Sequence, residues 1–255
     1  MSVEAIVKAA EGKGARIGYF ALMPDGSSNG HRQDEIFLSA STIKIAIMIE
    51  LFRQIDAGKL SLSDTYTLTE ADRVPGSGIL QEMHTGLEMT LRDVCYLMIS
   101  ISDNSATNIL INHVGMENVN ATMRSMGVHQ SVLGRPMRGR PALEGEPENL
   151  ATPAEFVTMV NAILEGTAAS ANSCMSMMEM LQLQSNDRRI GRFVPEGTVW
   201  GSKTGSFTTV VNDAGFVATP DGPLVVAVYT EDVPDMVVGE IIISEIVREL
   251  LATIS

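Results

Sequence analysis

A serine and a lysine lie three positions apart, at Ser41 and Lys44, where an apolar stretch with helical periodicity begins. Residues three apart project from the same face of a helix, so this hydroxyl and this amine would be neighbours. A serine hydroxyl is a poor nucleophile unless a base lies beside it, and a desolvated lysine can be that base. An isolated lysine in an apolar helix more often extends its ammonium to water along its methylene stem. The pair alone is therefore weak support for a nucleophilic serine.

Two further short motifs follow along the chain. Ser-Asp-Asn, at residues 102–104, lies between two segments of helical periodicity, where all three residue types are also favoured as ordinary helix caps. Lys-Thr-Gly, at residues 203–205, lies in an alternating segment that we expect to be a strand, and its glycine indicates close approach by another group. A phosphate-binding loop is excluded, because Ser202 rather than glycine precedes the lysine and no helical pattern follows.

Taken together, and in this order, the three motifs are typical of class A β-lactamases and penicillin-binding proteins. The chain resembles the class A β-lactamase-like serine hydrolases over nearly its whole length. The resemblance implies that Ser41 is the acylated nucleophile, Lys44 the proton acceptor or relay, and Ser102 the donor to the leaving nitrogen. The backbone N–H groups of Ser41 and Ser206 would form the oxyanion hole. The residues implied in substrate binding are Asn104, Lys203, Thr204, Gly205 and Ser206.

The resemblance weakens in the loop at residues 133–153. Class A enzymes carry a glutamate here, usually followed four residues later by an asparagine, and this glutamate activates the water that hydrolyses the acyl-enzyme. The loop contains Glu144, Glu146 and Glu148, and none of them has an asparagine four residues on. We expect Glu144 or Glu146 to be the catalytic base, because Glu148 lies nearest the next helix start, where a carboxylate would interact with the helix dipole.

A second departure concerns recognition of the substrate carboxylate. Family members often place a carboxylate-binding arginine near residues 231–240, and this stretch contains no basic residue here. Binding of a carboxylate would then depend on Lys203 together with Ser102, Thr204 and Ser206.

Three functions fit these residues. A class A-like β-lactamase is the one we favour. The alternatives are a serine amidase, esterase or D-amino-acid peptidase on the same scaffold, and a penicillin-binding sensor that stays acylated. Fold alone cannot separate them, because one scaffold hosts several activities.

Composition restricts the partners. The 255 residues carry a formal net charge of −13, which argues against nucleic acid as a partner. No apolar run approaches the roughly 18 residues of a membrane span, and the first residues do not read as a signal peptide. We expect a cytoplasmic monomer as the chain stands, or a periplasmic or secreted one if a leader has been removed. The expected ligand is a small molecule that carries a carboxylate, with no metal ion and no cofactor.

The order of the elements predicts the fold. Strand patterns near the two chain ends flank a region of helical periodicity, and an amphipathic helix closes the chain. We therefore expect an α/β protein of the α+β type and β-lactamase-like architecture. Its antiparallel sheet would be built from both chain ends and flanked by helices, beside an all-helical lobe. The sheet lobe would comprise residues 1–42 and 185–255, the helical lobe residues 43–184, and the active site would lie between them.

Overall fold

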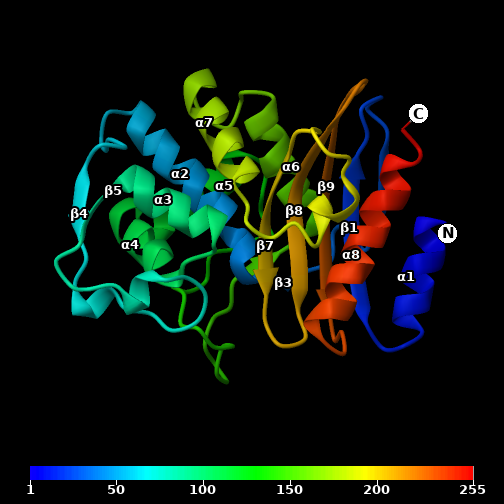
Figure 1. Ribbon diagram of the computed structural model, residues 1–255, viewed down its shortest axis with the longest axis horizontal. Coiled ribbons are helices and arrows are strands. Elements are labelled where there is room, and N and C mark those ends of the chain that lie inside the picture. Colours follow the sequence, from blue (N-terminus) through cyan, green and yellow to red (C-terminus); the bar gives the residue numbers. More distant parts are fainter. Residues whose placement is uncertain (255) are drawn as a thin grey trace.

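The computed structural model describes residues 1–254 and contains a five-stranded antiparallel sheet with a largely helical region beside it (Figure 1). The first and last parts of the chain pair directly, because β1 aligns with β9 from Arg16 opposite Glu231 to Leu22 opposite Val225. This confirms the α+β fold predicted from the sequence. In sheet order the strands are β2 (Ser28–His31), β1 (Arg16–Leu22), β9 (Gly222–Glu231), β8 (Val211–Thr219) and β7 (Trp200–Ser206).

Helices cover both faces of this sheet. Helices α1 and α8 pack on one face, where their apolar sides share a core with the sheet (Figure 1). Helix α6 packs on the other face, where Phe156 meets the ring of Tyr229 on β9 edge-on at 5.7 Å. The α-helices are α1 (Val3–Glu11), α2 (Lys44–Asp56), α3 (Leu91–Ser100), α4 (Asn104–Val114), α5 (Met116–Ser125), α6 (Pro153–Leu164), α7 (Ala171–Gln182) and α8 (Met236–Leu251).

Short elements connect these layers and flank the predicted motifs. One 3₁₀ turn, η1, leads directly into α2, and another, η4, precedes β7. The minor strands are β3 (Phe37–Leu38), β4 (Thr65–Thr67), β5 (Glu88–Thr90) and β6 (Leu150–Ala151), and the 3₁₀ turns are η1 (Ala40–Ile43), η2 (Glu70–Asp72), η3 (Leu80–Glu82) and η4 (Ile190–Phe193).

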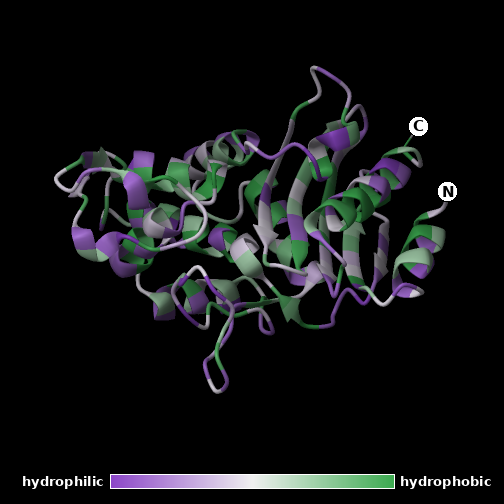
Figure 2. Cartoon of the chain, turned by 60° about the horizontal axis from the view of Figure 1, so that its bottom comes forward, coloured by the Kyte–Doolittle hydropathy of each residue, from purple (hydrophilic) through white to green (hydrophobic). Residues whose placement is uncertain are grey.

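Helix α2 is the centre of the helical region. Its residues from Lys44 to Phe52 are all buried, as expected for a helix that is apolar on every side. Helices α3 to α7 surround it, and their apolar residues join those of the sheet in one continuous core. Figure 2 shows hydrophobic residues concentrated along the packed helices and strands, with the connecting loops more hydrophilic. Helix α6 packs on both the sheet and α2, so it joins the two parts of the protein. The division into two lobes at residues 42/43 and 184/185 stays a prediction.

Across residues 1–254, no helix has both the length and the apolar character needed to cross a membrane.

Candidate active site

Ser41 lies in the turn η1, immediately before the buried helix α2. The turn is held on the sheet side by Thr42, whose hydroxyl donates to the Ser39 carbonyl at 2.7 Å and lies 2.9 Å from the hydroxyl of Tyr229. Ala40 adopts a left-handed backbone with φ 46°, a strained conformation for a residue with a Cβ. These constraints leave the Ser41 side chain partly exposed at the helix start, while its neighbours are buried.

Lys44 does not extend to water. It is fully buried, and its Nζ donates to the Ser102 carbonyl at 2.8 Å, to Ser102 Oγ at 3.1 Å and to Asn104 Oδ1 at 3.1 Å. Burial lowers the pKa of Lys44 well below its usual value; the charge of Lys203 lowers it further and that of Asp103 opposes the shift. A lowered pKa favours the neutral amine, which is the form that can accept a proton.

The Ser-Asp-Asn motif both caps a helix and builds the site. Asp103 is the N-cap of α4 and accepts a hydrogen bond from Ala106 N at 2.9 Å, as ordinary capping would require. Its other oxygen accepts from the backbone N–H groups of Ile79 and Leu80, at 2.6 and 2.8 Å. A Cβ at Gly78 would lie 2.2 Å from the Asp103 carboxylate carbon, so the glycine is required for this contact. Asp103 thus fixes the loop beside the site, a role that sequence reasoning missed.

The Lys-Thr-Gly motif lies on β7, the edge strand that touches η1. A Cβ at Gly205 would lie 2.8 Å from the Ser39 carbonyl oxygen and 2.9 Å from Ser41 N, so only glycine allows the strand this close. Lys203 is fully buried, and its Nζ donates to the Thr204 carbonyl at 2.8 Å. Burial lowers the pKa of Lys203 to about 7; Asp213 opposes this shift and Arg189 adds to it.

Arg189 is a site residue that sequence reasoning did not find. Its side chain is 1% exposed and donates to the carbonyls of Gly205 at 2.9 Å and Asn212 at 2.6 Å, and to Ser206 Oγ at 2.6 Å. Its Nε lies 3.6 Å from a carboxylate oxygen of Glu240 on α8. The chain before η4 carries no periodic pattern that would mark one arginine as buried, so the local sequence offered no signal.

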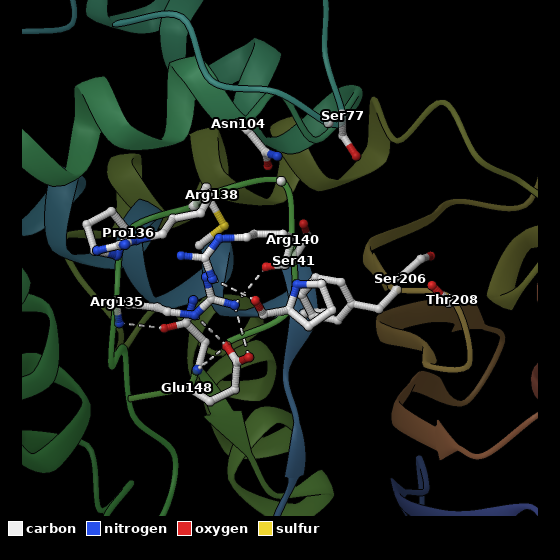
Figure 3. Close-up of a pocket in the computed structure, with 17 residues that line it drawn as sticks. Ser41, Ser77, Asn104, Arg135, Pro136, Arg138, Arg140, Glu148, Ser206 and Thr208 are labelled. Atoms are coloured by element: carbon white, nitrogen blue, oxygen red, sulfur yellow. Dashed lines mark hydrogen bonds and ion pairs between the residues drawn. The ribbon is translucent and has the colours of Figure 1, made fainter. Parts of the chain in front are cut away.

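Ser41 lies between two pockets. One, of about 300 Å³, is lined by Ser41 together with Ser102, Arg189, Thr204, Gly205 and Ser206. The other, of about 270 Å³, lies toward the loop at residues 133–153 (Figure 3). Its polar and charged lining includes Ser41, Ser77, Asn104, Arg135, Arg138, Arg140, Glu148, Asn149, Ser206 and Thr208.

The two lysines line neither pocket. Lys44 and Lys203 are both fully buried, and the charge of Lys203 lowers the pKa of Lys44. The structure therefore brings Ser102 and Asn104 together around the amine of Lys44, places Ser41 three residues before this lysine in η1, and places the third motif beside that turn.

Of the three loop glutamates, the structure places Glu148 and not Glu144 or Glu146 at the pocket that contains Ser41. Glu144 is exposed, and neither Glu144 nor Glu146 lines the pocket that contains Ser41, whereas Glu148 does. Hydrogen bonds from Arg140 and the backbone lower the pKa of Glu146 to about 2, which makes it a weak base. The dipole argument that set Glu148 aside does not describe its position, because its carboxylate binds Arg135.

Glu148 has no free oxygen lone pair to offer. Its Oε1 accepts from Arg135 Nε at 3.0 Å and Asn149 N at 2.9 Å. Its Oε2 accepts from Arg135 Nη2 at 3.0 Å and Ala142 N at 3.1 Å. Figure 3 shows Glu148 beside Arg135. An ionised carboxylate has about four lone-pair sites, so these contacts saturate it. Burial raises the pKa of Glu148, but its hydrogen bonds outweigh burial and the pKa lies below the usual value.

Across residues 1–254, no group of three or more His, Cys, Asp or Glu side chains could hold a metal ion.

The fold and this arrangement are those that the resemblance to the class A β-lactamase-like serine hydrolases implies. The profile of the beta-lactamase enzyme family matches residues 2–254, and the chain belongs to that family. The class A resemblance drawn from the sequence is thereby confirmed.

Several individual proteins are similar to this chain. A beta-lactamase of Rhodobacter capsulatus is 35% identical over 183 residues, which cover 70% of this chain and 62% of that protein, less than two thirds of its length. Beta-lactamase SME-1 of Serratia marcescens is 29% identical over 233 residues, which cover 88% of this chain and 79% of that protein. The crystal structure of a beta-lactamase from Sphaerobacter thermophilus is 52% identical with a TM-score of 0.97, covering 98% of this chain and 96% of its own. A structure of PBP-A is 25% identical with a TM-score of 0.89, and the match covers 99% of this chain and 95% of the PBP-A chain.

Proposed function

We propose that this chain is a class A-like β-lactamase that opens the β-lactam amide by acylation of Ser41. The observation that carries the proposal is the buried amine of Lys44, one helical turn from Ser41 and hydrogen-bonded to Ser102 and Asn104. The relatives named beta-lactamase and the family match support the same activity, and no comparison favours the amidase or sensor alternatives.

The chemistry uses the neutral form of Lys44, which its lowered pKa favours. In that form two N–H groups satisfy the Ser102 carbonyl and Asn104 Oδ1, and a lone pair takes the place of the hydrogen bond that a charged amine donates to Ser102 Oγ. This lone pair can accept a hydroxyl proton. Ser41 Oγ attacks the lactam carbonyl while its proton passes to Lys44, and Ser102 carries the proton onward to the departing nitrogen. The carbonyl carbon–nitrogen bond breaks and an ester forms on Ser41. General-base catalysis of this kind contributes about 10²- to 10⁴-fold.

Recognition of the substrate carboxylate is proposed for the pocket that contains Arg189. The guanidinium already donates to Ser206 Oγ, so it orients that hydroxyl and adds a fixed positive charge where Thr204 and Ser206 line the pocket. Arg189 would thus supply the arginine that residues 231–240 lack. Lys203 is buried and does not line the pocket, so it would attract the substrate carboxylate through its charge and not through a direct contact.

Hydrolysis of the acyl-enzyme is proposed to depend on Lys44 as well. Of the pocket-lining residues within 1–254, Glu148 is the one carboxylate, and its lone-pair sites are saturated. A neutral amine that accepted a proton during acylation can accept one from water once the leaving group has departed. Glu148 would then act on turnover only by holding the loop through Arg135.

Intact-protein mass spectrometry over time with benzylpenicillin tests this function. A β-lactamase gains the mass of one penicillin during turnover and returns to its original mass when the substrate is exhausted. An adduct that persists for hours would support the sensor alternative, and benzylpenicillin that neither forms an adduct nor is hydrolysed would support an amidase or peptidase with another substrate.

A further inference from the structure

Three arginines line the pocket on the loop side of Ser41. Arg135, Arg138 and Arg140 all border this pocket of about 270 Å³ (Figure 3). The chain as a whole has 31 acidic and 18 basic residues, so a pocket with three arginines and one glutamate reverses the overall charge. A reversal of this kind beside a reacting serine points to an anionic ligand.

The carboxylates of the loop do not neutralise this charge completely. Glu148 pairs with Arg135, whereas Arg138 and Arg140 share the single carboxylate of Glu146. Arg140 makes two hydrogen bonds to Glu146, at 2.7 and 2.9 Å, and Arg138 makes one at 3.1 Å. The Arg138 side chain is 50% exposed, and its remaining N–H groups have no hydrogen-bond partner within residues 1–254. Arg138 is therefore the guanidinium available to a ligand.

The backbone on both sides of Arg138 is fixed. Met137 is held by Asn108, which accepts from Met137 N at 2.8 Å and donates to Met137 O at 2.9 Å. Gly139 has φ +65°, and a Cβ there would lie 2.2 Å from the Pro75 carbonyl oxygen, so the loop tip packs directly on the facing loop. Arg138 is thus anchored at the pocket, which reduces the entropy lost when its side chain binds a ligand.

We propose that this pocket binds a second anionic group, a carboxylate on the acyl side chain of the substrate. The inference rests on the proposed function, because the acyl group is the part that stays on Ser41. Two pockets flank Ser41, and an arginine lines each of them: Arg189 on one side and Arg138 on the other. The preferred substrate class is then a β-lactam dianion with one carboxylate on each side of the reacting amide. A planar guanidinium suits this task because it can bind a carboxylate through two parallel hydrogen bonds.

A matched pair of penicillins tests the inference. Benzylpenicillin and its analogue with a carboxylate on the side-chain α-carbon differ by this one group. We would measure kcat/KM, or the rate of acylation where turnover is slow, for both in wild type, Arg138→Gln, Arg138→Lys and the control Arg124→Gln. Arg124 is exposed near the end of α5 and lines neither pocket, so its variant removes the same charge elsewhere.

The measured quantity is the ratio of the two rates, dianion over monoanion. Arg138→Gln should lower this ratio about tenfold, Arg138→Lys should lower it less, and Arg124→Gln should leave it within twofold. Glu146→Gln, which frees Arg138 and Arg140 from their shared carboxylate, should raise the ratio. An unchanged ratio in Arg138→Gln, with both penicillins acylating Ser41, would overturn this inference alone. Failure of both penicillins to acylate wild type would overturn the proposed function together with it.

Discussion

The positive charge of Lys203 should be lost within the pH range of ordinary activity assays. Burial lowers the pKa of this lysine to about 7, so raising the pH removes a charge from beneath the carboxylate pocket without any mutation. With that pKa, about half of the Lys203 side chains are protonated at pH 7, about a tenth at pH 8 and about a hundredth at pH 9. Because kcat/KM reports the free enzyme, it should fall about tenfold per pH unit above pH 7 for a substrate with a carboxylate.

The decline should end at a plateau. Arg189 and the hydroxyls of Thr204 and Ser206 remain when Lys203 is neutral. A hydrogen bond to a charged group is worth about 1.5–3 kcal/mol, so the plateau should lie about ten- to a hundredfold below the value at low pH. Because the charge of Lys203 acts on recognition, kcat at saturating substrate should change little over the same pH range.

The assay is a set of pH–rate profiles for an anionic penicillin and a neutral ester on wild type and Lys203→Arg. The arginine variant should show no decline between pH 7 and 9, because an arginine keeps its charge there. A neutral ester that loses activity in parallel with the penicillin would refute the reasoning, since the charge of Lys203 would then act on the chemistry and not on recognition.

Four further substitutions test the other parts of the site. Lys44→Met should slow acylation of every substrate by about 10²- to 10⁴-fold. At pH 7 it should also raise the thermal midpoint, because a lysine whose pKa is lowered in the folded protein costs stability at any pH below its unfolded pKa. This gain in the thermal midpoint should shrink as the pH rises toward 10. Gly205→Ala should abolish acylation of a protein that remains folded, because its Cβ would meet Ser41 N at 2.9 Å, and wild-type acylation by this variant would contradict that contact. Glu144→Gln should hydrolyse the acyl-enzyme at the wild-type rate. Glu148→Gln should loosen the loop that Arg135 holds and lower the thermal midpoint measured by calorimetry. Accumulation of acyl-enzyme in Glu144→Gln alone would restore Glu144 as the catalytic base.

The sequence predicted those parts of the site that depend on local spacing. Ser41 and Lys44 are one turn apart at a helix start, so their proximity follows from helix geometry alone. The place of Gly205 beside another group also followed from its type, since a glycine within a strand indicates close approach. The antiparallel sheet from both chain ends followed from the strand patterns and is present as β1 paired with β9.

The parts of the site that the sequence did not indicate depend on partners distant in sequence. Arg189 becomes a site residue only because β7, β8 and α8 meet around it, and its partners lie up to 51 positions away at Glu240. The loop glutamates could not be ranked from the sequence, because their availability depends on which arginine each one binds. Glu148 is saturated by Arg135 and two backbone N–H groups, and no spacing rule indicates that contact.

The central claim is that Ser41 is the residue acylated with the help of Lys44. Its most direct test is peptide mapping by mass spectrometry after brief exposure of wild type, Ser41→Ala and Lys44→Met to benzylpenicillin. The adduct should lie on the wild-type peptide that contains Ser41, should be absent from Ser41→Ala, and should form at least a hundredfold more slowly in Lys44→Met. An adduct on another residue, or one that forms in Ser41→Ala at the wild-type rate, would contradict the claim.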